Sequence, residues 1–273
     1  MALLAVLWIV AALSLIAVGL TRSLRDETRS VALARQQVQA QALGDAALQI
    51  ALQALVASRQ PLARVATTDV TWQGVPIHVE LMPLNGLIDL NMAAPPLLAR
   101  LFAVAGGLAP DAAQALAQAV VQARQRRDAR GTSQRFEAVE DLLRVPGVGY
   151  DLYARLAPLL TADLRGSGRV NPMAAPLGVL AVLAGGNPAA AQQIAAARDA
   201  GQVGIDTTAL DASLIDSTPS RRLRATARVP MADGAAVRVA RSVDLDGRGD
   251  DGAPWLTFRL VTSVEPAAVQ PTP

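Results

Sequence analysis

The first twenty residues of this chain carry no charged side chain, and this feature constrains the fold more than any other. As a helix rising 1.5 Å per residue, a segment of this length spans about 30 Å, the thickness of the hydrocarbon core of a bilayer. The segment lacks the basic start and the small-residue cleavage site that are typical of a secretory signal peptide. We therefore predict that residues 1–21 form the transmembrane half of an N-terminal helix.

The helical pattern continues beyond the apolar segment. Apolar residues recur at intervals of seven and then of four and three, at Leu24, Val31, Val38, Leu48, Leu52 and Leu55. We predict an amphipathic continuation of the same helix over residues 22–58, ended by Pro61. Its apolar stripe must pack on a sheet or on other helices. Arg22 and Arg25 directly follow the apolar segment, and the positive-inside rule taken alone would place the bulk of the chain in the cytoplasm.

Composition excludes several classes of function. The chain has no cysteine, so it needs no disulfide and holds no thiolate metal site. All 25 basic residues are arginine, and the net charge of +2 does not require nucleic acid as a partner. Aromatic residues make up only 3% of the chain, so the core must be built from alanine, leucine and valine.

Two regions with the alternating pattern of strands flank a long helical region. Residues 59–92 are predicted to form the first part of a small antiparallel sheet, with a hairpin turn at Gln73-Gly74. Residues 203–265 are predicted to form its C-terminal strands, a three-stranded meander, and residues 266–273 a disordered tail. His78, the only histidine, is interpreted as a solvated strand residue because no second histidine or cysteine completes a site.

Residues 93–202 are predicted to form an inserted helical domain that contains an internal repeat. The segments Asn91–Leu97 and Asn171–Leu177 have nearly the same sequence. Each is followed by an apolar run, a Gly-Gly pair and a proline suited to the first turn of a second helix, Pro110 or Pro188. Two similar helix pairs are therefore expected.

A central piece between the two helix pairs resembles a helix-hairpin-helix element. Helical segments flank Val145-Pro-Gly-Val-Gly149, and the second is predicted to reach Leu160. Glycine hairpins of this kind can expose backbone amides to a phosphate. Four arginines nearby are candidates for further phosphate contacts: Arg144, Arg155, Arg165 and Arg169. The alternative is a purely structural element, which the balanced net charge favours.

The sharpest polar cluster holds four carboxylates in eight residues, Asp244, Asp246, Asp250 and Asp251. Carboxylate oxygens in a glycine-rich loop are typical calcium ligands. An EF-type loop is a poor fit, because Arg248 stands at its fifth position and Trp255 replaces the bidentate glutamate. The alternative is a solvated turn between strands. No catalytic constellation is found, so the chain is not expected to be an enzyme.

Taken together, these features resemble a type IV pilin-like subunit, an α+β fold with a long N-terminal helix, a small antiparallel sheet and here a large helical insert. More specifically, the chain resembles the K-type minor pseudopilins of the type II secretion system (general secretion pathway protein K). The resemblance rests on three segments: Ala2–Trp8, Asn85–Asn91 with its echo at Val170-Asn171, and Phe136–Gly147.

The resemblance implies a precursor whose short basic leader is removed by prepilin peptidase, with Met1 as the expected mature N-terminus. The leader would keep the basic residues inside and place the body in the periplasm, as a single-pass protein of the bacterial inner membrane. In most pilins position five is a glutamate that pairs with a neighbouring subunit; here it is Ala5, as is typical of the K-type. The missing carboxylate and the bulky insert together suggest a subunit that caps the tip.

The implied partners are the I-type and J-type minor pseudopilins, the major pseudopilin filament and secreted proteins, and no nucleic acid is expected. The family also favours calcium binding, without identifying the ligands. The predicted function is to initiate and cap the pseudopilus. The competing hypothesis is a membrane-anchored DNA-binding protein for uptake, built on the helix-hairpin-helix element.

Overall fold

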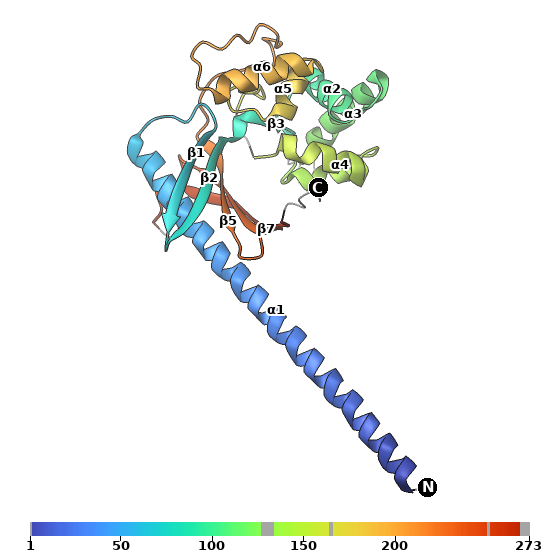
Figure 1. Cartoon of the computed structure of the whole chain (residues 1–273). Helices are drawn as coiled ribbons and strands as arrows, with labels where there is room; N and C mark the ends of the chain where they lie inside the picture. The colour runs from blue at the N-terminus through green and yellow to red at the C-terminus, as the bar shows by residue number, and fades with distance from the viewer. Residues whose placement is uncertain (1, 127–133, 164–165, 250–251, 268–273) are drawn as a thin grey trace.

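The computed structural model describes residues 2–126, 134–163, 166–249 and 252–267. For residues 2–29 it describes only the backbone. A single helix, α1 (Ala2–Ser58), contains 57 residues and extends far beyond the rest of the molecule (Figure 1). At 1.5 Å per residue it is roughly 85 Å long. The prediction of one continuous helix is therefore confirmed. The chain leaves it at Arg59, whose φ of 54° ends the helical path.

A five-stranded antiparallel sheet follows, in the order β1-β2-β5-β6-β7. Its strands are β1 (Ala66–Trp72), β2 (Val75–Pro83), β5 (Arg222–Pro230), β6 (Ala236–Asp244) and β7 (Leu256–Glu265). The β1-β2 hairpin turns at Gln73 and Gly74, both with positive φ, as a two-residue hairpin loop prefers. Strands β5 to β7 form the predicted meander. The whole helical block is inserted between the neighbouring strands β2 and β5.

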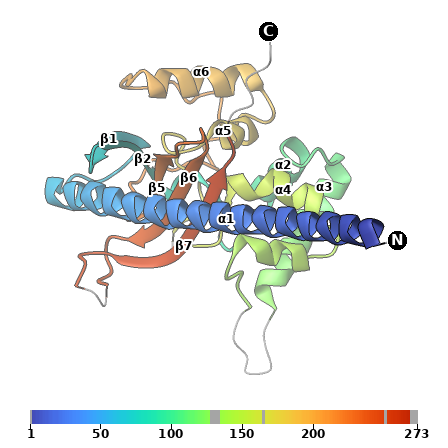
Figure 2. The same ribbon diagram turned by 60° about the horizontal axis from the view of Figure 1, so that its bottom comes forward.

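The second half of α1 packs across one face of this sheet (Figure 2). The contact is made by buried small and branched residues of the helix, Ala40, Leu43, Ala47, Leu48, Ala51 and Leu52. Gly44 lies so close to β6 that an added Cβ would be 2.7 Å from Cγ2 of Val239. On the same face Arg241 reaches back to Asp45 of α1 at 2.7 Å. Small helix residues thus bring the helix close to a valine-rich sheet.

The helical block contains two similar helix pairs, as predicted from the repeat. The first pair is α2 (Pro95–Val104) with α3 (Pro110–Gln125), and the second is α5 (Leu177–Leu183) with α6 (Pro188–Asp199). In both pairs a glycine with positive φ, Gly107 or Gly186, lies in the connection. Between the pairs along the chain lie α4 (Tyr150–Leu156) and β4 (Leu160–Thr161), and β4 pairs in parallel with β3 (Ile88–Asp89), which precedes α2.

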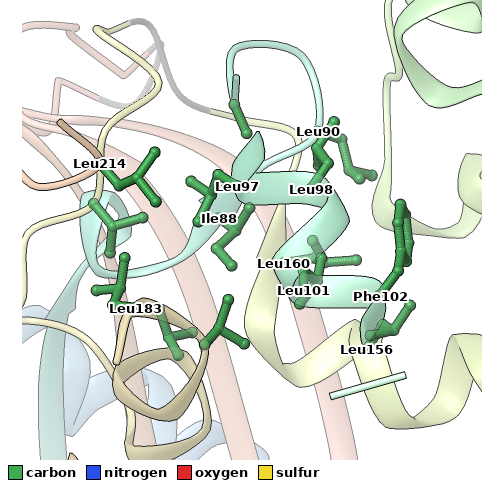
Figure 3. Close-up of a cluster of buried hydrophobic side chains, with 14 of the residues drawn as sticks. Ile88, Leu90, Leu97, Leu98, Leu101, Phe102, Leu156, Leu160, Leu183 and Leu214 are labelled. Carbon is green, nitrogen blue, oxygen red and sulfur yellow. The ribbon is translucent and has the colours of Figure 1, made fainter. Parts of the chain in front are cut away.

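This block has its own hydrophobic core, separate from the core between α1 and the large sheet. Leucines dominate it, with Phe102 at one side (Figure 3). The cluster extends beyond residues 93–202 in both directions. It takes in Ile88 and Leu90 before the first helix pair, and Leu210 and Leu214 after the second. Residues between α6 and β5 therefore help to close the helical core.

The central piece differs from the prediction at both of its helices. The first is a 3₁₀ helix at Val139–Arg144, because Pro146 follows too soon for a longer segment. The second helix, α4, ends at Leu156 and not at Leu160. Pro158 lacks the N–H that would continue the helix, so a single 3₁₀ turn covers Ala157–Leu159. A further 3₁₀ turn occupies Leu84–Gly86. Of the predicted disordered tail, residues 268–273 lie outside the part that the structure describes.

Candidate functional site

The helix α1 changes its surroundings along its length. Val31 and Val38 have 63% and 69% of their surface exposed, whereas Ala47 is fully buried on the sheet. Among the residues whose side chains the structure describes, Ser30–Ser58 is the one helical stretch long and apolar enough to span a bilayer. A third of its most apolar part is nevertheless buried inside the protein. The uncharged segment lies on the same helix, N-terminal to this stretch. An apolar helix that continues from a sheet-packed half suits a membrane anchor.

Asn91, at the start of the first repeat, binds the central piece to the helical core. Its amide nitrogen donates to the carbonyl oxygens of Phe136 and Ala162, at 2.9 and 3.1 Å, and its Oδ1 accepts the backbone N–H of Phe136. Asp89 accepts the N–H groups of residues 91 and 92. Arg124 of α3 donates to two carbonyl oxygens of the same turn, and burial lowers the pKa of its guanidinium. The conspicuous motif is therefore a structural joint.

Asn171, the equivalent residue in the second repeat, contacts a different part of the chain. Its side-chain amide donates to the carbonyl oxygen of Ala63, just after α1, at 2.7 Å. Its backbone N–H donates to the carbonyl of Asn85. At this joint Gly86 allows a close approach, since an added Cβ would lie 2.2 Å from the carbonyl oxygen of Ala174. The second repeat thus fastens the helical block to the sheet.

In the glycine hairpin of the central piece, some of the groups that could contact a phosphate are already engaged within the chain. The N–H of Val148 already donates to the carbonyl of Val145. Arg144 is paired with Asp141, and Arg155 donates to the carbonyl of Gly106. Arg165 lies outside the described residues. These three groups, the N–H of Val148 and the guanidinium groups of Arg144 and Arg155, therefore already have partners within the chain.

The acidic loop after β6 is described only in part. Asp244 is largely buried and its Oδ2 accepts from Nε of Arg222 at 2.9 Å. Asp246 is exposed and pairs with Arg221 at 3.0 Å. Asp250 and Asp251, the other two predicted calcium ligands, lie outside the described residues. His78 lies elsewhere, on strand β2, and its side chain is exposed, as expected for a solvated strand residue. Its Nδ1 is 2.8 Å from Oδ1 of Asp69.

Sequence reasoning missed a polar cluster that joins the sheet to the helical block. Arg259 of β7 donates from Nε and Nη2 to the two carboxylate oxygens of Asp163, each at 3.1 Å. This hydrogen bonding is the main reason that the pKa of Arg259 is raised. Arg222 donates to the carbonyl of Asp163 and lies over the ring of Phe258, 4.9 Å from its centroid. These partners are up to 96 residues apart in sequence, so no local pattern signals them.

Comparison with known proteins supplies a likeness of fold. Neither a protein-family model nor a curated protein sequence matches the chain. Among solved structures, it is similar to the crystal structure of the GspK-GspI-GspJ complex from the type 2 secretion system of enterotoxigenic Escherichia coli. The match is to the GspK chain and covers 87% of this chain and 99% of that one. The TM-score is 0.56 and the sequence identity is 14%.

The likeness extends over most of this chain and nearly the whole of the other, so it is not confined to a single element. An α+β chain with a long N-terminal helix, an antiparallel sheet and inserted helices is what the sequence predicted. The chain has the pilin-like fold of a GspK-type minor pseudopilin.

Proposed function

We propose that this chain is a minor pseudopilin of a type II secretion system that initiates and caps the pseudopilus tip. The observation that carries the proposal is the fold shared with GspK over 87% of the chain, in a complex whose other members are GspI and GspJ. The role is structural and involves no catalysis by this chain. Its partners are an I-type and a J-type minor pseudopilin, and the filament and secreted proteins lie beyond them.

The mechanism is packing by two surfaces. The apolar N-terminal half of α1 anchors the chain in the inner membrane, with the body in the periplasm. The exposed valines of α1 then join the helices of neighbouring subunits. The helical block lies at the end of the molecule away from the N-terminus of α1 (Figure 1). In this position it would cover the end of a stack of pilin-like subunits, where Ala5 leaves no carboxylate for a further neighbour.

Co-purification tests this proposal directly. The full chain, carrying an affinity tag at its C-terminus, would be co-expressed with I-type and J-type minor pseudopilins and extracted in mild detergent. We expect a complex of the three chains at defined stoichiometry on size-exclusion chromatography. As the control for non-specific association of apolar helices, the tagged chain would be co-expressed with an untagged major pseudopilin and without the I-type and J-type chains.

An electrophoretic shift assay with the same detergent-solubilised chain examines the DNA-binding hypothesis. Binding through phosphates would weaken steeply as salt is raised. Salt-sensitive binding of duplex DNA at micromolar protein, together with failure to recover the I-type and J-type chains, would overturn the proposed function. The arginines that already pair within the chain lead us to expect no shift.

We also propose that the acidic loop binds calcium through Asp244, Asp246, Asp250 and Asp251. The donor chemistry suits a hard cation, and the carboxylate of Asp246 is accessible because 68% of its side chain is exposed. Calcium would compete with Arg221 for this carboxylate. We expect calcium, but not magnesium at the same concentration, to raise the melting temperature, and Asp246→Asn to reduce the rise. Equal melting temperatures with calcium and with a chelator would contradict this proposal.

A further inference from the structure

A cleft of about 160 Å³ lies between the sheet and the central piece of the helical block. Its floor is formed by residues of β5, β6 and β7 on the face opposite α1, and its wall by residues around α4. Three arginines line it, Arg224, Arg238 and Arg259. The volume is that of about five water molecules, which suits a small polar group better than an extended ligand.

The strand register brings two of these arginines to either side of one serine. Arg224 of β5 pairs directly with Ser242 of β6, and Ser242 pairs directly with Arg259 of β7. Directly paired residues of an antiparallel sheet point to the same face, with Cβ atoms about 5 Å apart. A hydroxyl therefore lies between two guanidinium groups at the bottom of the cleft.

The three arginines differ in the acidic partners that their guanidinium groups have. Arg259 is held by Asp163, and Arg238 lies 4.0 Å from Glu265. Arg224 is half-buried, and its side chain makes no hydrogen bond or ion pair with any residue that the structure describes. Burial is the main cause that lowers the pKa of its guanidinium, and the nearby charge of Arg238 lowers it further, while the charges of Asp163 and Glu80 act in the opposite direction. A half-buried cation without a partner costs stability unless an anion joins it.

Charge balance indicates which anion fits. The lining contains three arginines and two carboxylates, Glu140 and Asp163, and the charges of Glu80 and Glu265 act on Arg224 and Arg238 from outside it. A singly charged carboxylate is therefore repelled less by these acidic groups than a phosphate dianion would be. The planar fork of Arg224 is matched to the two oxygens of a carboxylate, and Ser242 can donate a further hydrogen bond.

We propose that this cleft binds a single carboxylate group, with Arg224 as its principal ligand and Ser242 and Arg238 as supporting ligands. The group has two sources of the same chemistry, a small free carboxylate and an acidic side chain of a polypeptide. This site is independent of the tip-capping role and of the acidic loop.

The test uses the detergent-solubilised full chain and its melting temperature. Sodium acetate and N-acetyl-glutamate α-amide, which carries one side-chain carboxylate in a peptide-like setting, are each compared with sodium chloride at equal ionic strength. At ten times the Kd we expect a rise of about 2–4 °C over chloride. A lower Kd for the glutamate derivative assigns the site to a polypeptide side chain, and an equal Kd assigns it to a free carboxylate.

Variants separate this site from general anion binding. Arg224→Gln should weaken carboxylate binding at least tenfold, and Arg224→Lys, which keeps the charge without the fork, should weaken it less. Arg221→Gln, which removes an exposed arginine paired with Asp246 outside the cleft, is the control and should bind as the wild type does. The proposal is overturned if Arg224→Gln retains the full rise, if neither carboxylate exceeds chloride, or if inorganic phosphate binds more tightly than acetate.

Discussion

The unit of α1 and the large sheet differs from the helical block in how each buries its apolar residues. The helical block closes a leucine-rich core on itself, with Phe102 and ten or more other residues fully buried. In the first unit Ala47 and Leu48 of α1 are buried on the sheet, whereas Val31 and Val38 of the same helix remain exposed. A helix that leaves large apolar residues uncovered is suited to a membrane or to other helices. Under the proposed function α1 is the part that assembles, while the helical block has a core of its own.

The largest expected effect comes from a cavity in the helical core. Phe102→Ala should cost about 3–5 kcal/mol of unfolding free energy, because the side chain is fully buried. Since the two cores are separate clusters, hydrogen exchange should accelerate in α2 and α3 and stay slow in β5 and β6. Leu33→Ala, at an exposed position of α1, is the control. Equal loss of protection in both regions would show that the two cores unfold together.

A close approach in the other core should be the next most sensitive point. Gly44→Ala places a Cβ 2.7 Å from Val239, so α1 must move away from the sheet. Overpacking of this kind costs about 1–3 kcal/mol. The effect should be seen as a lower midpoint in denaturant titration. Gly166→Ala, where nothing lies within 4 Å of the added Cβ, should be nearly neutral, and a similar loss in both variants would contradict the argument.

The connection between the two regions can be weakened by Asp163→Asn. The substitution removes the charge that accepts two hydrogen bonds from Arg259 in a largely buried setting. We expect a loss of about 1–3 kcal/mol, because hydrogen bonds to charged groups are the stronger ones. Both regions should keep their own exchange protection while the amides of β7 near Arg259 exchange faster. Unchanged stability, or slower exchange of these β7 amides, would show that the pair of Asp163 and Arg259 does not hold the two regions together.

A pH-dependent contribution is expected where the segment after α6 closes the helical core. The pKa of Asp211 is lowered, chiefly because Ser213 donates to its carboxylate from both hydroxyl and backbone, and Arg100 pairs with it at 2.8 Å. A lowered folded-state pKa stabilises the protein above the unfolded pKa of about 4. This stability is lost as pH falls from there through the folded pKa.

Thermal unfolding between pH 5 and pH 3 measures this contribution. Asp211→Asn should lower stability at pH 5 and flatten the dependence on pH. Ser213→Ala removes one of the two donated bonds and should flatten it in part. An unchanged slope in Asp211→Asn would mean that other carboxylates account for the acid sensitivity.

Local patterns predicted most elements of both regions, because their signals are contained in short stretches of sequence. The hairpin turn at Gln73-Gly74 and the starts of the second helices at Pro110 and Pro188 require only neighbouring residues. The short 3₁₀ helix before the glycine hairpin was misjudged because its amphipathic pattern does not distinguish it from an α-helix of the same length.

Contacts between the regions were not predictable in this way. The pairing of Arg259 with Asp163 joins residues 96 positions apart, and the alignment of Arg224 and Ser242 depends on the register of the sheet. The four aspartates showed a similar problem. Their spacing suggested one site, which stays a prediction. The spacing did not show that Arg222 pairs with Asp244 and Arg221 with Asp246, because these partners lie more than twenty residues earlier in the chain.

The smallest effect on stability should accompany the clearest effect on assembly. Val38→Asp adds a charge where 69% of the residue is exposed, so the free energy of unfolding should change by no more than about 0.5 kcal/mol. If this surface packs against helices of other subunits, a buried carboxylate there would be costly, and recovery of the I-type and J-type chains should fall sharply. Gln37→Asp adds the same charge one residue away, on a different side of the helix. Equal loss in both variants would point to a general charge effect, whereas unchanged recovery for Val38→Asp would show that α1 assembles through another side.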